Sequence, residues 1–352
     1  MKTQKYFKLF ANCIPVKGFT RSLICDIQRG NIFFIPNDLM EIITNHKTKN
    51  LKQIFNIYGK VNKKIIDDYF TFLIQNEYGF WCDSEDELDL FPDIDLTYYS
   101  PFEITNVIID IDKNIGYDFN NLITQLELLG CVDVQIRCFS CQELSYIDNL
   151  LSNFTNKRVK SIELVLKYNE NLNKQHYREL FDKHLRLSML LLFGANRYEE
   201  INIIEGNSNI IFTTENIQNK THCGVIHQAY FTSNISTFTE SQHHNTCLNR
   251  KISIDVDGEI KNCPSMTKSY GNIKDTTLAE ALAKEGFKDM WHIKKDQIKV
   301  CQDCEFRHIC TDCRAYLQDP NDLYSKPAKC SYDPYTATWG AENPTNNTLY
   351  GQ

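Results

Sequence analysis

The sequence lacks long hydrophobic runs and has few basic residues relative to acidic ones. No window approaches the roughly 18 consecutive apolar residues of a membrane-spanning helix. The 38 Lys and Arg residues against 45 Asp and Glu residues give a net charge of -7, and no Lys/Arg-rich stripe offsets it. The first residues, broken by Lys5 and Lys8, lack the apolar core and cleavage site of a signal peptide. We therefore expect a cytoplasmic protein with neither a membrane nor a nucleic-acid partner.

Familiar catalytic motifs are also missing. No phosphate-binding loop, G-x-S-x-G element or His-Glu-x-x-His element is present, so nucleotide-dependent, esterase and zincin chemistry have no support. The 352 residues, of which 42% are hydrophobic and 24% charged, suffice for two or three soluble domains. The pattern of expected strands and helices, given below, predicts an α+β or α/β multidomain protein.

What the sequence has instead is cysteine, and its distribution is uneven. Six of the 14 cysteines are scattered over the first 222 residues, whereas eight fall between positions 223 and 330. Stable disulfides are rare in the cytoplasm, which makes a disulfide network the weakest interpretation. Eight thiols suit two four-thiolate metal sites, and zinc and iron–sulfur clusters both use such sites. The count favours clusters, and zinc stays open because the ligand types are identical.

Residues 1–82 predict a small α+β unit of winged-helix type. We expect a strand over residues 6–16, a hairpin over residues 22–35 that turns at Gly30, and helices that begin at Pro36, Leu51 and Lys63. Residues 79–82 return as a short strand. An exposed strand edge, at residues 11–16 or in the hairpin, would allow an extended peptide to add by backbone pairing.

Residues 83–95 contain seven acids and no base, which predicts a solvated linker over 83–102. Residues 103–220 then alternate between strands and helices, a pattern that predicts a mostly parallel sheet arranged as a partial (β/α) barrel. Strands are expected over residues 104–112, 132–139, 161–168 and 209–217. Helices are expected over residues 119–130, 140–154 (capped by Ser140) and 173–195.

Residues 221–340 form a predicted third domain, followed by a tail over 341–352. The segment KISIDVDGEIKNC (251–263) predicts a hairpin with a type I′ turn at Asp257-Gly258, which would bring Cys247 and Cys263 together. Its acidic residues are expected to be turn and solvent-face residues (Asp255, Asp257 and Glu259). Thr277 and Glu280 predict a capping box for a helix over 277–291.

Within residues 222–339, four stretches carry a resemblance to a known family: TCLNRKISID, EIKNCPSM, CEFRHICTDCRAY and KPAKCSYDPYT. They resemble the SPASM domain, and specifically the SPASM-domain peptide maturase of grasp-with-spasm systems. The resemblance implies a precursor-leader-binding domain at residues 1–82, a radical-SAM-like middle domain and a C-terminal SPASM domain. It also implies two [4Fe–4S] clusters and, as partners, a ribosomally made precursor peptide and an ATP-grasp ligase.

The family's ligand pattern, carried over by position, implies two interleaved ligand sets. Cluster one would be bound by Cys223, Cys247, Cys263 and Cys313, and cluster two by Cys301, Cys304, Cys310 and Cys330. The chain departs from the usual pattern in the C310-x-x-C313 spacing, which is two residues rather than three. Because Cys223 lies far upstream of Cys247, His222, His243 and His244 are alternative ligands for cluster one. If they are not ligands, we expect these histidines, like His227, to lie around the ligands or at the surface.

The middle domain departs from the family more sharply. Radical SAM enzymes bind their catalytic cluster with C-x3-C-x2-C after the first barrel strand, and residues 108–121 contain no cysteine. Cys138 and Cys141 supply two thiols one unit later, and are expected to be incidental. We therefore expect a degenerate domain without a SAM site, and catalytic residues remain unassigned. The alternatives are an active radical SAM or redox enzyme and a zinc-stabilised adaptor.

Overall fold

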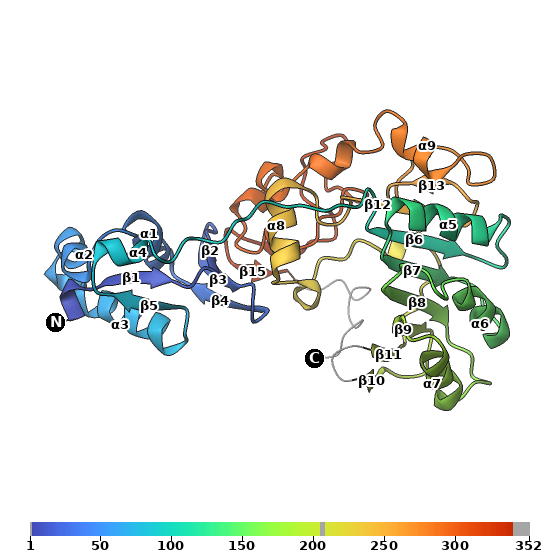
Figure 1. The fold of residues 1–352 in the computed structure, drawn as a ribbon, viewed down its shortest axis with the longest axis horizontal. Coiled ribbons are helices and arrows are strands. Elements are labelled where there is room, and N and C mark those ends of the chain that lie inside the picture. Colours follow the sequence, from blue (N-terminus) through green and yellow to red (C-terminus); the bar gives the residue numbers. More distant parts are fainter. Residues whose placement is uncertain (1, 205–207, 341–352) are drawn as a thin grey trace.

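The computed structural model describes residues 2–204 and 208–340, and the predicted tail over 341–352 lies outside them. Three regions follow one another along the long axis (Figure 1). The N-terminal region lies at one end and the α/β region at the other. The cysteine-rich C-terminal region, last in the sequence, lies between them and contacts both.

The N-terminal region combines two small sheets with three helices. Its strands are β1 (Tyr6–Leu9), β2 (Cys13–Val16), β3 (Ser22–Asp26), β4 (Asn31–Ile35) and β5 (Gly79–Cys82), and its helical segments are η1 (Lys2–Gln4), α1 (Asn37–Asn45), α2 (Leu51–Tyr58), η2 (Lys60–Asn62) and α3 (Lys63–Gln75). Strands β2, β3 and β4 form one antiparallel sheet, and β1 pairs with β5 in another. The prediction of one strand over residues 6–16 was therefore wrong.

Local sequence explains most of these boundaries. A turn in which the Cys13 N–H donates to the Phe10 carbonyl (2.9 Å) separates β1 from β2. Gly30 adopts a positive φ of 74° in the predicted hairpin turn, where a side chain would be strained. Asn50 caps α2 in a capping box. Helix α3 ends at Gln75, with Asn76 as its C-cap, and β5 begins at Gly79 as predicted.

The acidic segment is more ordered than the solvated linker that its composition predicts. It contains a short helix, α4 (Glu85–Leu88), and then runs along the molecule toward the α/β region (Figure 1). Asp93 forms ion pairs with Lys8 (3.0 Å) and Lys47 (3.2 Å). Ion pairs with the N-terminal region therefore fix part of a segment that sequence alone assigns to solvent.

The α/β region is built on an open, mainly parallel sheet. Its strands are β6 (Asn106–Ile111), β7 (Asp133–Cys138), β8 (Ser161–Lys167), β9 (Leu187–Phe193), β10 (Glu199–Ile204) and β11 (Ser208–Thr213), and its helices are α5 (Phe119–Leu129), α6 (Leu144–Ser152) and α7 (Lys174–Lys183). In the described chain the strand order is β10-β11-β9-β8-β7-β6-β12-β13. Strands β12 and β13 come from the C-terminal region, so the sheet continues across the predicted boundary at residue 220.

Two predictions for this region were wrong. The expected helix over 173–195 is α7 followed by β9, because its second half is an apolar run buried within the sheet. The predicted cap Ser140 does not begin α6, which starts at Leu144 after Glu143. The Ser140 hydroxyl instead donates to the Asp112 carbonyl.

The C-terminal region contains only short elements. They are η3 (Lys220–His222), η4 (Gln228–Tyr230), α8 (Ile235–His243), β12 (Lys251–Ile254), β13 (Ile260–Lys261), α9 (Leu278–Ala283), η5 (Asp289–His292), η6 (Lys295–Gln297), η7 (Cys301–Asp303), β14 (Tyr332–Asp333) and β15 (Thr338–Trp339). The predicted capping box at Thr277 is present. The helix ends well before residue 291, however, and Gly286 follows with a φ of 86°.

The N-terminal sheet packs directly on the C-terminal region. Leu23 and Cys25 of β3 share a buried apolar cluster with Phe306 and Ile309. The Arg21 guanidinium donates to the buried Glu305 carboxylate at 2.8 Å. The cysteine-rich region is thus held between the N-terminal sheet on one side and the α/β sheet on the other.

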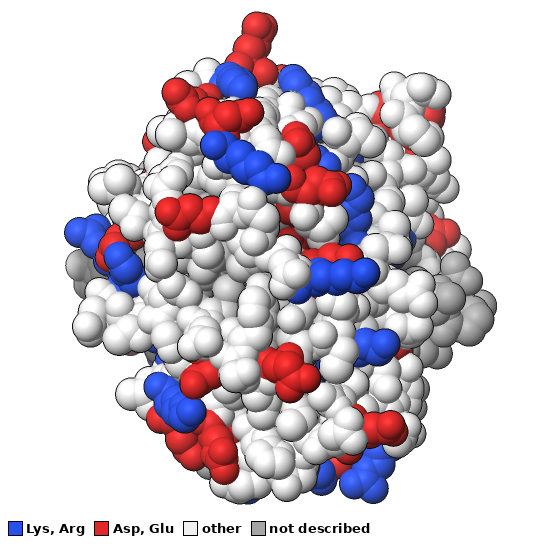
Figure 2. All heavy atoms as spheres, turned by 90° about the vertical axis from the view of Figure 1, so that its right-hand side faces the viewer, with Lys and Arg blue, Asp and Glu red and all other residues white. Residues whose placement is uncertain are grey.

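The surface of the α/β end carries charges of both signs. Figure 2 shows Lys and Arg side chains interspersed with Asp and Glu side chains on this face, without a broad patch of one sign. Among the described residues, no helix is both long and apolar enough to cross a membrane.

Candidate metal centre

Four predicted ligands, Cys223, Cys247, Cys263 and Cys313, form what we call the first cysteine group. Cys223 follows η3, Cys247 precedes β12 and Cys263 follows β13. The thiols of Cys223 and Cys263 are hydrogen-bonded, which lowers the pKa of Cys223 and raises that of Cys263. The Cys313 sulfur lies 2.7 Å from the point where a Cβ on Gly224 would stand. Any larger residue at Gly224 would press on this thiol.

Two cations face the first group. The Lys251 ammonium lies 3.6 Å from the Cys247 sulfur. Burial opposes its charge, yet the thiolates of Cys247, Cys263 and Cys223 outweigh burial and raise the pKa of Lys251. The pKa of Cys223 is lowered mainly by the hydrogen bond from Cys263 and further by the charge of Arg137, whereas burial acts to raise it. Burial nevertheless raises the pKa of Cys247 and of Cys313, so Cys223 is the one thiol of this group with a lowered pKa.

The other four predicted ligands, Cys301, Cys304, Cys310 and Cys330, form the second cysteine group. They come from η7, the loop that follows it and the turn before β14. One buried ammonium, that of Lys295, lies 3.7 Å from the Cys310 sulfur and 4.0 Å from the Cys301 sulfur. Burial raises the pKa of Cys310 to about 12, and Lys295 acts against this shift.

Apolar side chains shield the second group. Cys304, Cys310 and Cys330 belong to the cluster that contains Phe306 and Tyr332. The same cluster includes β3, so the N-terminal sheet forms part of the surroundings of this group. A low-dielectric setting strengthens the attraction between Lys295 and thiolates, because water does not screen it.

The eight thiols lie in two sets, each beside a lysine ammonium, and thiolates are the donors that iron–sulfur clusters use. Within residues 2–204 and 208–340, no three His, Cys, Asp or Glu side chains converge on a single ion. An iron–sulfur cubane places each thiolate on a different iron. The half-buried Lys251 beside the first set and the buried Lys295 beside the second supply positive charges that an anionic cluster would compensate. Thiolate donors are equally suited to zinc.

A buried ion pair lies near the segment where the family resemblance would place a radical SAM motif. Asp110, near the end of β6, accepts two hydrogen bonds from Arg137 of β7, at 2.7 and 2.8 Å. Both side chains are buried. Cys138 is buried at the end of β7, whereas Cys141 is exposed. The bidentate pair therefore links the two strands beside the point where a catalytic cluster would be expected.

The histidines near the predicted ligands differ in burial and in their neighbours. His222 immediately precedes Cys223, and burial together with Lys329 and Arg137 lowers its pKa. His243 is exposed, whereas the His244 ring packs against Tyr98 and His292. The ring of His227 packs against Tyr230 and Trp339.

The expectation for Asp255 was wrong. Its side chain is buried and forms a 2.6 Å ion pair with Lys261. Its carboxylate also accepts hydrogen bonds from the backbone N–H groups of Asp257 (3.1 Å) and Glu259 (3.0 Å). These bonds lie within a loop that is longer than the predicted two-residue turn. Asp257 and Glu259 themselves lie at the loop.

Comparison with known proteins supplies the class of the C-terminal region. The family model for SPASM, described as an iron–sulfur cluster-binding domain, matches residues 246–305. That range contains Cys247, Cys263, Cys301 and Cys304. The chain therefore carries a SPASM domain, as the motifs predicted.

Other comparisons add less. No curated protein matches the chain. Streptococcus suis SuiB bound to S-adenosylmethionine is 12% identical over 92% of this chain and 97% of that chain, with a TM-score of 0.38. SuiB bound to its precursor peptide SuiA is 10% identical over 91% of this chain and 98% of that chain, with a TM-score of 0.41. At such low values no function is transferred from SuiB.

Proposed function

We propose that this protein is a maturation component for a ribosomally synthesised peptide. In this proposal it binds the precursor leader through residues 1–82 and carries two [4Fe–4S] clusters in its C-terminal region. It acts with an ATP-grasp ligase and does not cleave S-adenosylmethionine itself. The observation that carries the proposal is the SPASM match, together with eight thiols in two sets that each face a lysine ammonium.

The chain's own residues would bind and shield these clusters. The first cysteine group would hold one cluster and the second group the other, and bound clusters supply electron transfer. Lys251 and Lys295 balance the charge of the sulfurs. Phe306 and Tyr332 keep water from the second group.

Strand β4 is the best-placed edge for an extended leader. It is an outer strand of the β2-β3-β4 sheet, and its Phe33 and Phe34 are 37% and 38% exposed. A cavity of about 160 Å³ lies beside it, lined in part by Ile32, Phe34 and Phe231. The opposite edge strand, β2, contains Pro15, which has no N–H to donate to an added strand.

Leader binding can be tested by fluorescence anisotropy with a labelled candidate leader. The substitution Phe33→Asp should weaken binding by about tenfold, because it removes an apolar contact and adds a charge at the edge. Val61→Asp is the matched control, since Val61 is 94% exposed on η2. Equal affinity of both variants for the leader, with unchanged circular dichroism, would argue against β4 as the binding edge.

Two competing functions predict different results. A zinc-stabilised adaptor uses the same thiolate donors, and would contain zinc without inorganic sulfide. An active radical SAM enzyme would release 5′-deoxyadenosine from S-adenosylmethionine after reconstitution and reduction. The proposal predicts none of this product, since the described chain holds only Cys138 and Cys141 near the expected motif.

A further inference from the structure

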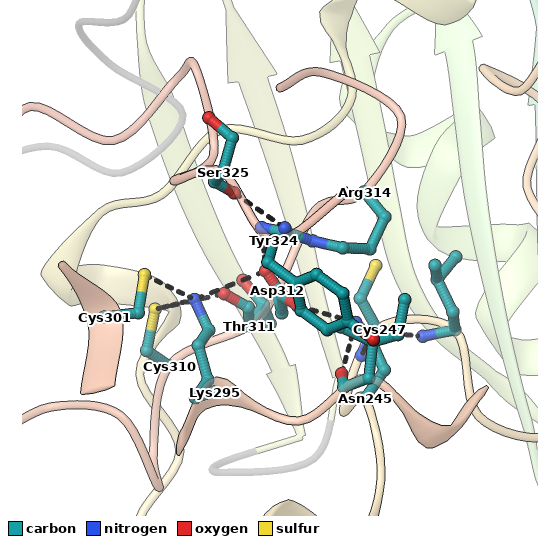
Figure 3. A network of polar contacts seen from close by, with 12 residues as sticks. Asn245, Cys247, Lys295, Cys301, Cys310, Thr311, Asp312, Arg314, Tyr324 and Ser325 are labelled. Atoms are coloured by element: carbon teal, nitrogen blue, oxygen red, sulfur yellow. Dashed lines mark hydrogen bonds and ion pairs between the residues drawn. The ribbon is translucent and has the colours of Figure 1, made fainter. Parts of the chain in front are cut away.

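A continuous buried polar network connects the two cysteine groups, and Asp312 lies at its centre (Figure 3). Asp312 stands in the sequence between Cys310 of the second group and Cys313 of the first. One of its carboxylate oxygens lies 3.5 Å from the Lys295 ammonium. That ammonium in turn contacts the Cys310 and Cys301 sulfurs of the second group.

The other carboxylate oxygen leads to the first group. It accepts a 2.6 Å hydrogen bond from the Asn245 side-chain amide. The side-chain carbonyl oxygen of Asn245 in turn accepts hydrogen bonds from the backbone N–H groups of Cys247 (3.0 Å) and Leu248 (2.9 Å). The position of Cys247 is thus fixed by the same carboxylate that positions Lys295.

The network is closed to water. Asp312 and Asn245 are each 1% exposed, and Lys295 is 5% exposed. Arg314 donates to Asp312 at 2.7 Å and holds the 323–325 loop through the carbonyls of Leu323 (3.1 Å) and Ser325 (2.7 Å). A buried network of this kind is stable only when each member keeps its partners, so a disturbance at one end reaches the other.

We propose that Asp312 is a positioning residue shared by both cysteine groups, so that loading one group with iron preorganises the other. This inference rests on the proposed cluster sites. When the second group binds an anionic cluster, Lys295 is held at its sulfurs and Asp312 is fixed. The fixed carboxylate then orients Asn245 and, through it, Cys247.

The test is anaerobic iron and sulfide titration of the full-length apoprotein, read as iron bound per chain. Loading of the first group is measured in the intact chain and in Cys304→Ala, which disables the second group. We expect Cys304→Ala to need about tenfold more free iron to load the first group, within the usual range of coupling between sites. In an Asp312→Asn background this ratio should fall to about one. Asp319→Asn, an exposed acid in the same region, should leave the ratio unchanged.

Each outcome is informative. A ratio that persists in Asp312→Asn overturns the inference while the cluster sites stand. Wild-type protein that binds no iron overturns both the sites and the inference. If circular dichroism shows that Asp312→Asn does not fold, Lys295→Met decides, because it keeps the side-chain length and removes only the charge; it too should reduce the ratio to about one. Lys299→Met, at a 70% exposed side chain, is its control, and equal ratios in the two lysine variants overturn the inference.

Discussion

The α/β region and the C-terminal region are held together by different forces. The α/β region buries a continuous apolar core along parallel strands, in which Ile136 and Leu164 are fully buried. The C-terminal region adds residues such as Leu248, Ile252 and Phe287 to the same core. Its strands and helices are short, however, and its buried residues also include polar and charged groups such as Asp312, Lys295 and Glu305. Apolar burial can stabilise the first region by itself. The second combines apolar burial with fixed polar contacts and, in our proposal, with bound metal.

Metal removal should have the largest effect, because it should destabilise the C-terminal region and leave the α/β region folded. Chelation under anaerobic conditions should open the C-terminal region, because binding free energy there is folding free energy. Hydrogen exchange of residues 295–330 should accelerate by about a hundredfold or more, whereas β6–β9 and strand β12, which pairs with β6, should keep their protection. Uniform acceleration over both regions would show that they do not differ in this way.

Cysteine substitution should separate the two clusters. Cys304→Ala and Cys313→Ala should each leave about half of the iron at saturation, because each removes a ligand from one set of four. The remaining clusters should give different EPR spectra in the two variants. Cys13→Ala, which changes a buried thiol of the separate N-terminal core outside both sets, is the control for iron content. Identical residual spectra in Cys304→Ala and Cys313→Ala would contradict the separate assignment.

A core substitution in the α/β region should lower its stability without affecting iron. Leu164→Ala removes a fully buried side chain from β8 and should cost about 3 kcal/mol of unfolding free energy. Urea unfolding followed by circular dichroism measures this loss, and iron per chain should stay at the wild-type value. Leu128→Ala, at an 82% exposed position, should change little. A matching loss of iron in Leu164→Ala would mean that the two regions are coupled more tightly than we infer.

The smallest effect is expected at the contact between the N-terminal and C-terminal regions. Arg21→Met leaves the buried Glu305 carboxylate without its ion pair. Since the Arg21 side chain is 32% exposed, solvent screening reduces the cost to about 1–2 kcal/mol. Thermal unfolding of wild type and variant measures it. Lys174→Ala breaks an exposed ion pair with Glu199 and should give no measurable shift; an equal shift in both variants would remove the special role of Arg21.

Sequence predicted local structure well where one residue decides it. Gly130 ends α5 in the left-handed conformation, and the capping box at Thr277 begins α9, as expected from their chemistry. The run that became β9 was assigned to a helix because short apolar segments have no periodicity that separates a buried strand from a helix. Strand β10 was missed altogether.

The sequence indicated the cysteines of the candidate site but not the charged residues beside them. The uneven distribution of cysteines indicated a thiolate site, and the two ligand sets implied by the family resemblance stay a prediction. Lys251 and Lys295 were missed, since a lone lysine in sequence is ordinarily a surface residue. Only the fold places their ammonium groups at the sulfurs. The sequence offered one indication for Asp312, because this residue stands between two predicted ligands of different clusters.

Iron, zinc and acid-labile sulfide content of the anaerobically purified protein tests the central claim most directly. Two [4Fe–4S] clusters predict about eight iron and about eight sulfide per chain, with a brown chromophore and little zinc. Zinc at one or two ions per chain without sulfide, or less than about one iron per chain after reconstitution, would contradict the account.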